Sequence, residues 1–228
     1  MSFLKKFIKL MKHEHLAKKG KSRFAWALDE SKFLKLNEVR KLRRYCDKLR
    51  KAALRSGKAT PIRDWFMIEL GLNAGLRVSE MRDLKCSDLH LQSEQSSLSV
   101  RKGKGNKPRN VRISDYFKKE CGWYLAWKLK LRHCTSPESY LLTIKKDRQL
   151  TKRALQKAFK RCMAGAGLPE HYSIHCLRHT YGSHLYLASS HNLRLVQEQL
   201  GHSSVRVTEV YANLMNSDVK RAIEKLYK

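Results

Sequence analysis

Long apolar runs are missing from this sequence. No stretch approaches the roughly 20 consecutive apolar residues that a membrane-spanning helix needs, so we expect no such span. The first ten residues are apolar and basic, but three lysines interrupt them and no small-residue cleavage site follows, so we expect no secretory signal. An amphipathic segment that binds a membrane surface stays open for this stretch, although we favour a basic arm over residues 1–30.

Acidic residues are scarce. The 228 residues include 20 Asp and Glu against 49 Lys and Arg, which gives a formal net charge of +29. An excess of this size favours a polyanionic partner, and above all nucleic acid, because lysine and arginine on phosphates release condensed counterions. Composition alone also fits a ribosomal or histone-like protein that only binds. With 42% hydrophobic residues, the chain can form a core, and disorder throughout is excluded.

Paired cysteines are missing too. The six cysteines form no C-x-x-C pair and no regular spacing, which predicts reduced thiols in a cytoplasmic protein. His175 and His179 lie four residues apart, as in some zinc sites, but Cys176 stands where the H-E-x-x-H motif has glutamate. We therefore expect no metal and no cofactor.

The apolar periodicity predicts a mainly α fold with a small antiparallel β-sheet, an α+β class. One helix should follow Asn37 as its N-cap, carry an apolar stripe from Val39 to Ala53, and end before Gly57. A second should open at Thr60-Pro61 and be buried, with Gly71 and Gly75 allowing close packing or marking its end. Further helices are expected at 115–131, 151–164, 174–188, 192–200, 204–214 and 217–227.

Between residues 97 and 113 the period changes from helical to alternating. Leu98 and Val100 alternate with polar residues, the stretch 102–106 supplies turn chemistry, and Val111 and Ile113 alternate again. This pattern predicts a β-hairpin with a basic tip.

Three motifs could together cleave a phosphodiester without a metal. Such a reaction needs a nucleophile, cations on the phosphate oxygens, a proton donor for the leaving oxygen and a base. Arginine suits the cationic role, because its planar fork bonds two phosphate oxygens at once. The motifs are Gly75-Leu-Arg77-Val-Ser-Glu80, Ser173-Ile-His175-Cys-Leu-Arg178-His-Thr, and Leu200-Gly-His202 with Tyr211 nine residues after the histidine.

Taken in order, these motifs and the basic segment 102–109 resemble the catalytic domain of the tyrosine recombinase, or phage integrase, family over about residues 36–215. Each motif alone has an ordinary explanation. An Arg-x-x-Glu pair is usually a salt bridge, a G-K-G loop is usually a solvated turn, and Tyr211 alone could be a core tyrosine. Only the ordered set indicates the family.

The resemblance implies a role for each residue. Arg77 and Arg178 hold the scissile phosphate, and Tyr211 attacks it to form a 3′-phosphotyrosine. Lys104 protonates the leaving 5′-oxygen. His175 acts as a base or hydrogen-bond partner near the tyrosine. The remaining assignments are His202 as donor to a phosphate oxygen, Glu80 as the residue that orients the Arg77 guanidinium, and Lys102, Lys107 and Arg109 as DNA contacts.

The same resemblance implies an organisation. We expect a basic arm at 1–30, a catalytic domain at 31–215, and a C-terminal helix at 216–228 that packs on its own domain or docks on a neighbouring subunit. Most family members carry a further helical domain before the catalytic one, and we expect it to be absent here or reduced to the arm. The expected partners are double-stranded DNA, three more copies of the chain in a tetrameric complex, and an accessory DNA-bending protein.

The predicted function is site-specific recombination or integration of DNA. A type IB topoisomerase-like relaxase would use the same chemistry without a partner duplex, and an architectural DNA-binding protein would use none of it. The motifs G-L-R-V-S-E and L-G-H favour the recombinase, and the intact set of site residues argues against a degenerate enzyme.

Overall fold

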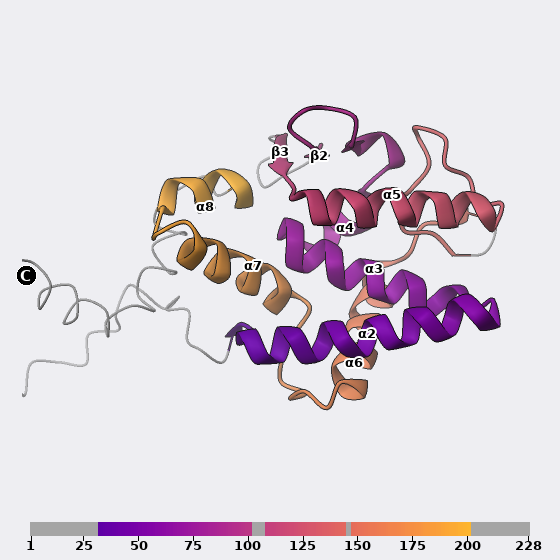
Figure 1. The fold of residues 1–228 in the computed structure, drawn as a ribbon, viewed down its shortest axis with the longest axis horizontal. Coiled ribbons are helices and arrows are strands. Elements are labelled where there is room, and N and C mark those ends of the chain that lie inside the picture. Colours follow the sequence, from indigo (N-terminus) through magenta and orange to yellow (C-terminus); the bar gives the residue numbers. More distant parts are fainter. Residues whose placement is uncertain (1–31, 102–107, 145–146, 202–228) are drawn as a thin grey trace, which may run out of the picture.

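The computed structural model describes residues 32–101, 108–144 and 147–201 (Figure 1). These residues form a mainly helical domain with one three-stranded antiparallel sheet, as the sequence predicts. Among the described residues, no helix is long and apolar enough to cross a membrane. The elements are α2 Leu36–Ser56, α3 Ala59–Ala74, α4 Val78–Asp83, the 3-10 turn η2 Cys86–Asp88, β1 Leu89–His90, β2 Ser97–Val100, β3 Arg109–Arg112, α5 Asp115–Lys130, α6 Lys152–Gly165, α7 His175–Ala188 and α8 Leu193–Leu200.

Helix α2 buries the predicted stripe from Val39 to Ala53 and ends at Gly57, whose φ of 70° makes the left-handed turn that glycine tolerates. The predicted N-cap, Asn37, is wrong by two residues, because Lys35 holds that position. Glu38 explains the shift. Its carboxylate accepts the Lys35 N–H at 2.8 Å and so satisfies a backbone donor that the first turn leaves unpaired.

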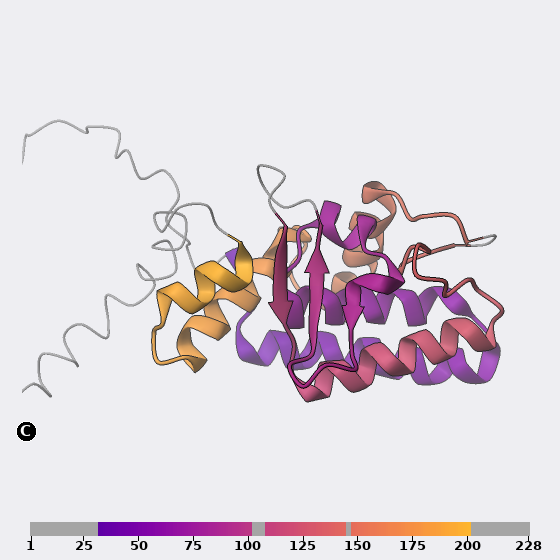
Figure 2. The ribbon, with the colours of Figure 1, turned by 90° about the horizontal axis from the view of Figure 1, so that it is seen from above.

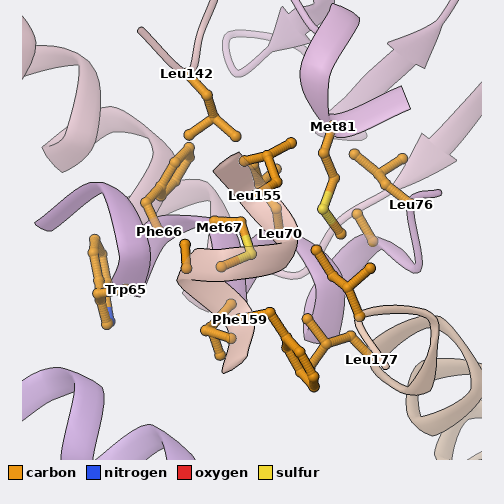
Figure 3. Close-up of a cluster of buried hydrophobic side chains, with 14 of the residues drawn as sticks. Trp65, Phe66, Met67, Leu70, Leu76, Met81, Leu142, Leu155, Phe159 and Leu177 are labelled. Atoms are coloured by element: carbon orange, nitrogen blue, oxygen red, sulfur yellow. The ribbon is translucent and has the colours of Figure 1, made fainter. Parts of the chain in front are cut away.

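Helix α3 is the central helix, and it contacts α2, α5, α6 and α7. It begins at Ala59, so the predicted N-cap Thr60 lies inside the helix, and Pro61 occupies the first turn, where its missing N–H has no intrahelical partner to lose. Figure 3 shows its apolar side chains meeting Leu155 of α6 and Leu177 of α7. A Cβ on Gly71 would lie 2.6 Å from the Leu177 side chain, which confirms that this glycine permits close packing.

The predicted hairpin is present. β2 and β3 pair antiparallel, with Leu98 opposite Val111 and Val100 opposite Arg109, and the predicted basic tip at 102–107 lies outside the described residues. Figure 2 shows β1 beside β2 as a third strand. The sequence did not reveal β1, because two residues are too few to display an alternating period.

Helices α7 and α8 form a corner at one end of the molecule (Figure 1). α7 packs on α3, while α8 packs on α7 and on β3. The segment before α2 crosses this corner, since the Leu34 N–H donates to Thr180 Oγ1 at 2.8 Å. The helices predicted at 204–214 and 217–227 lie outside the described residues, as does the predicted arm. The described contacts therefore hold the end of α3, strand β3 and the ends of α7 and α8 close together.

Candidate active site

A buried carboxylate, Glu80, lies where α3, α4 and β3 meet. Arg77 is the N-cap of α4 and Glu80 is its third residue, so the two side chains share the first turn. Glu80 Oε2 accepts the Arg77 N–H at 2.8 Å, and Glu80 Oε1 accepts Arg77 Nη1 at 2.7 Å. The Arg77 side chain is 24% exposed, whereas that of Glu80 is 3% exposed. The glutamate thus holds the arginine from the protein side and leaves part of it open to solvent.

Arg109 brings a second guanidinium to the same carboxylate. Its Nη1 and Nη2 donate to Glu80 Oε1 and Oε2, each at 2.9 Å, and its side chain is 9% exposed. Its Nε donates to the Gln199 carbonyl at 3.3 Å. The sequence predicted a DNA contact for Arg109, and the structure turns its guanidinium inward. The signal was available in the sequence, because Arg109 stands two residues from buried Val111 and so shares its face of the strand.

Arg178 brings a third guanidinium, from the first turn of α7. Its Nη1 donates to the Gly75 carbonyl at 2.7 Å and its Nη2 to the Leu200 carbonyl at 2.6 Å. Its Nη1 also lies 3.8 Å from Glu80 Oε2. These two carbonyl acceptors could not be found from sequence motifs, because any residue supplies a carbonyl. The structure therefore brings Arg77, Arg178 and Glu80 together, as their motifs predict.

The site carries more positive than negative charge, which favours binding of an anion. Burial by itself raises the pKa of Glu80, but the hydrogen bonds and charge of Arg109, the Arg77 N–H and the charge of Arg178 outweigh it and lower the pKa to about 2. The carboxylate is therefore ionised at neutral pH. Three guanidinium groups face one negative charge, so the site carries a surplus of positive charge that suits a phosphate.

His175 begins α7 beside these arginines. Desolvation by neighbouring atoms, and then the positive charges of Arg178 and Arg77, lower the pKa of His175 from its ordinary value of 6.5. A neutral imidazole can accept a proton, which a charged one cannot. At neutral pH this histidine is thus in the form that a base requires.

The last described residue, Gly201, adjoins the site. It has a φ of 63°, and a Cβ on it would lie 2.9 Å from Arg109 Nε. The close approach of β3 to the end of α8 therefore requires glycine there. The other predicted site residues lie outside the described residues, so their places and roles stay predictions: Lys102, Lys104, Lys107, His202 and Tyr211.

The fold is that of solved site-specific recombinases. A crystal structure of XerA recombinase matches 86% of this chain with a TM-score of 0.67 and 26% identity, over 65% of its own chain. XerH recombinase, solved bound to its difH substrate in a pre-cleavage complex, matches 86% of this chain with a TM-score of 0.65 and 26% identity, over 53% of its own chain. The fold therefore places the chain in the class of recombinase catalytic domains.

Sequence relatives agree with the fold. The profile of the Phage integrase family matches residues 32–217. Tyrosine recombinase XerC of Proteus mirabilis is 37% identical over 155 residues, which are 67% of this chain and 48% of that protein. XerC of Neisseria meningitidis is 33% identical over 171 residues, which are 75% of this chain and 53% of that protein. The chain belongs to the phage integrase family, and it spans about half the length of these curated relatives.

Proposed function

We propose that this protein is a site-specific DNA recombinase that breaks and rejoins strands through a tyrosine–DNA intermediate. The observation that carries the proposal is the convergence of Arg77 and Arg178 on ionised Glu80, in a family whose relatives are named tyrosine recombinases. Two arginines fixed at different angles can hold the oxygens of a phosphate while its charge is redistributed. Removal of one such preorganised donor typically costs about 10²–10³ in rate.

The reaction needs no external energy, because one phosphate ester replaces another. The Tyr211 oxygen attacks phosphorus, and the bond from phosphorus to the 5′-oxygen breaks. Neutral His175 can take the tyrosine proton, and Lys104 gives a proton to the departing 5′-oxygen. In the second step a 5′-hydroxyl of the other strand attacks the phosphotyrosine, which releases the tyrosine and rejoins the DNA. His202 stabilises a phosphate oxygen in both steps.

The proposed substrate is double-stranded DNA. The XerH structure holds its difH substrate, and the net charge of +29 on this chain supports the same class of partner here. We propose a basic arm at 1–30, a catalytic domain at 31–215 and a C-terminal helix at 216–228 that joins neighbouring subunits. Four subunits would hold two duplexes, and Lys102 and Lys107 would contact the DNA. An accessory DNA-bending protein would assist the complex, which would act in the cytoplasm at the nucleoid.

A covalent trapping experiment tests the chemistry. A nicked suicide substrate loses the short leaving strand after cleavage, so the phosphotyrosine accumulates. We expect a denaturant-resistant protein–DNA adduct that forms in excess EDTA and disappears in Tyr211→Phe, whereas DNA affinity stays nearly unchanged, because one hydroxyl adds little to a charge-dominated interface.

Three results would count against the proposal. An adduct at wild-type level in Tyr211→Phe would show that another residue is the nucleophile. Loss of cleavage in EDTA, restored by one metal, would indicate a two-metal nuclease. Relaxation of supercoils without exchange between duplexes would favour the topoisomerase-like alternative.

A further inference from the structure

We propose that Arg109 is a positioning residue of the reaction, which ties the carboxylate that holds Arg77 to the end of α8. The inference rests on the proposed function, because it concerns how the phosphate-binding groups are kept in place. It replaces the DNA contact that the basic hairpin suggests for this arginine.

The first step in the argument is the saturation of Glu80. An ionised carboxylate has about four acceptor sites, two on each oxygen. Oε1 accepts Arg77 Nη1 and Arg109 Nη1, and Oε2 accepts the Arg77 N–H and Arg109 Nη2. Arg109 therefore fills two of the four sites, one on each oxygen, and so fixes the plane of the carboxylate. Without it, Glu80 can rotate, and the Arg77 guanidinium loses a fixed acceptor.

The second step is the attachment of α8. Arg109 Nε donates to the Gln199 carbonyl, and Arg178 Nη2 donates to the Leu200 carbonyl. Two arginines thus hold consecutive carbonyls at the end of this helix. The chain then passes through Gly201, whose missing side chain makes room for Arg109. Arg109 therefore links β3, the strand that follows the Lys104 segment, to the segment that leads to His202.

The third step is the exclusion of direct DNA contact. The Arg109 side chain is 9% exposed, and both of its Nη atoms already donate to the Glu80 carboxylate, which leaves little of the guanidinium for a DNA phosphate. A contact to a phosphate other than the scissile one contributes mainly to affinity and to its salt dependence. A positioning residue affects the rate of the bound complex, so the two roles differ in a measurable way.

The test compares Arg109→Gln with Arg112→Gln, which removes the same charge from an exposed arginine on the same strand. The readouts are DNA affinity across a salt series and the single-turnover rate of adduct formation at saturating suicide DNA. We expect Arg109→Gln to keep wild-type affinity and salt slope but to form adduct about 10–100 times more slowly. Arg112→Gln should form adduct at the wild-type rate when saturated.

A conservative variant and a double variant distinguish positioning from general damage. Lysine keeps the charge but cannot bond both carboxylate oxygens in one plane, so Arg109→Lys should keep the fold and recover only part of the rate that Arg109→Gln loses. In Glu80→Gln, the further change Arg109→Gln should slow the reaction much less than it does alone, because the two residues act as a unit. Circular dichroism melting of each variant checks that the fold is kept.

Each contrary result has a distinct meaning. If Arg109→Gln or Arg109→Lys forms adduct at the wild-type rate, the positioning role is wrong. Lower affinity with a shallower salt slope and an unchanged saturated rate would make Arg109 a DNA contact instead. If the wild-type protein itself forms no Tyr211-dependent adduct, the proposed function fails, and the inference fails with it.

Discussion

Glu80 combines deep burial with a full negative charge, and arginine contacts make this possible. Its folded pKa of about 2 lies below the ordinary value of 4.5. A carboxyl group with a lowered pKa stabilises the fold above its unfolded pKa, and that contribution is lost as the pH falls through the folded value. Glu80 is therefore ionised at neutral and mildly acidic pH, and a pH dependence near neutrality must come from other groups.

His175 is the group from which we expect a pH dependence. Its pKa is lowered from 6.5, so the neutral ring persists somewhat below that pH, and the protonated ring accumulates only as the pH falls further. At subsaturating DNA, where the rate reports the free enzyme, adduct formation should be flat from pH 8 to 6.5 and decline below it. His175→Gln should be slower by about 10²–10⁴ and should lack this decline.

The measurement is a rate profile between pH 5 and 8 for both proteins. A wild-type decline centred above pH 6.5 would contradict the lowered pKa. A decline that persists unchanged in His175→Gln would assign it to another group.

The contact between α3 and α7 sets the distance between Arg77, which follows α3, and Arg178, which lies on α7. Gly75 ends α3 with a φ of 58°, and a Cβ on it would lie 2.9 Å from the Leu200 side chain and would also collide with Tyr181. The Gly75 carbonyl accepts a hydrogen bond from Arg178. This glycine therefore serves both the fold and the site.

We expect Gly75→Ala to destabilise the fold by about 2–4 kcal/mol, through left-handed strain and overpacking, and to slow adduct formation. Gly57→Ala is the matched control, because Gly57 has a φ of 70° but a Cβ there has no neighbour within 4 Å. Gly57→Ala should lower the free energy of unfolding by about 1 kcal/mol, through backbone strain alone, and leave the reaction rate unchanged. Urea denaturation and adduct rates measure both effects, and equal losses in the two variants would refute the packing argument.

The elements show what the sequence could and could not predict. Periodicity located the hairpin and the described helices except α4, because apolar stripes reflect burial directly, whereas six residues are too few to show a stripe. N-caps were misplaced at α2 and α3, since Glu38 and Pro61 suit the first turn at more than one position. Motifs identified Arg77 and Arg178 but not the two backbone carbonyls to which Arg178 donates. Arg109 was assigned to DNA from the family resemblance of its segment, although its alternation with buried Val111 predicts an inward side chain.

At the scale of the whole molecule, we expect the surplus of positive charge to dominate binding to the proposed DNA substrate. If it neutralises about six to ten phosphates, affinity should fall by about 10³–10⁵ between roughly 50 and 200 mM salt. Fluorescence anisotropy over a salt series measures this directly. A flat dependence of log affinity on log salt would mean that the net charge of +29 serves something other than phosphate contacts.

The site is assembled from parts that are far apart along the chain. Gly75 and Arg178, which share a hydrogen bond, are separated by 103 positions, and Arg109 lies between them in the sequence. During translation, Arg77 therefore emerges from the ribosome well before α7 has been synthesised. Until α7 docks on α3, the growing chain can attract DNA through its charge, but Arg77 and Arg178 cannot bind one phosphate together. Under the proposed function, we therefore expect nascent chains that lack α7 not to cleave DNA, because the phosphate-binding arginines come together only when α7 has docked.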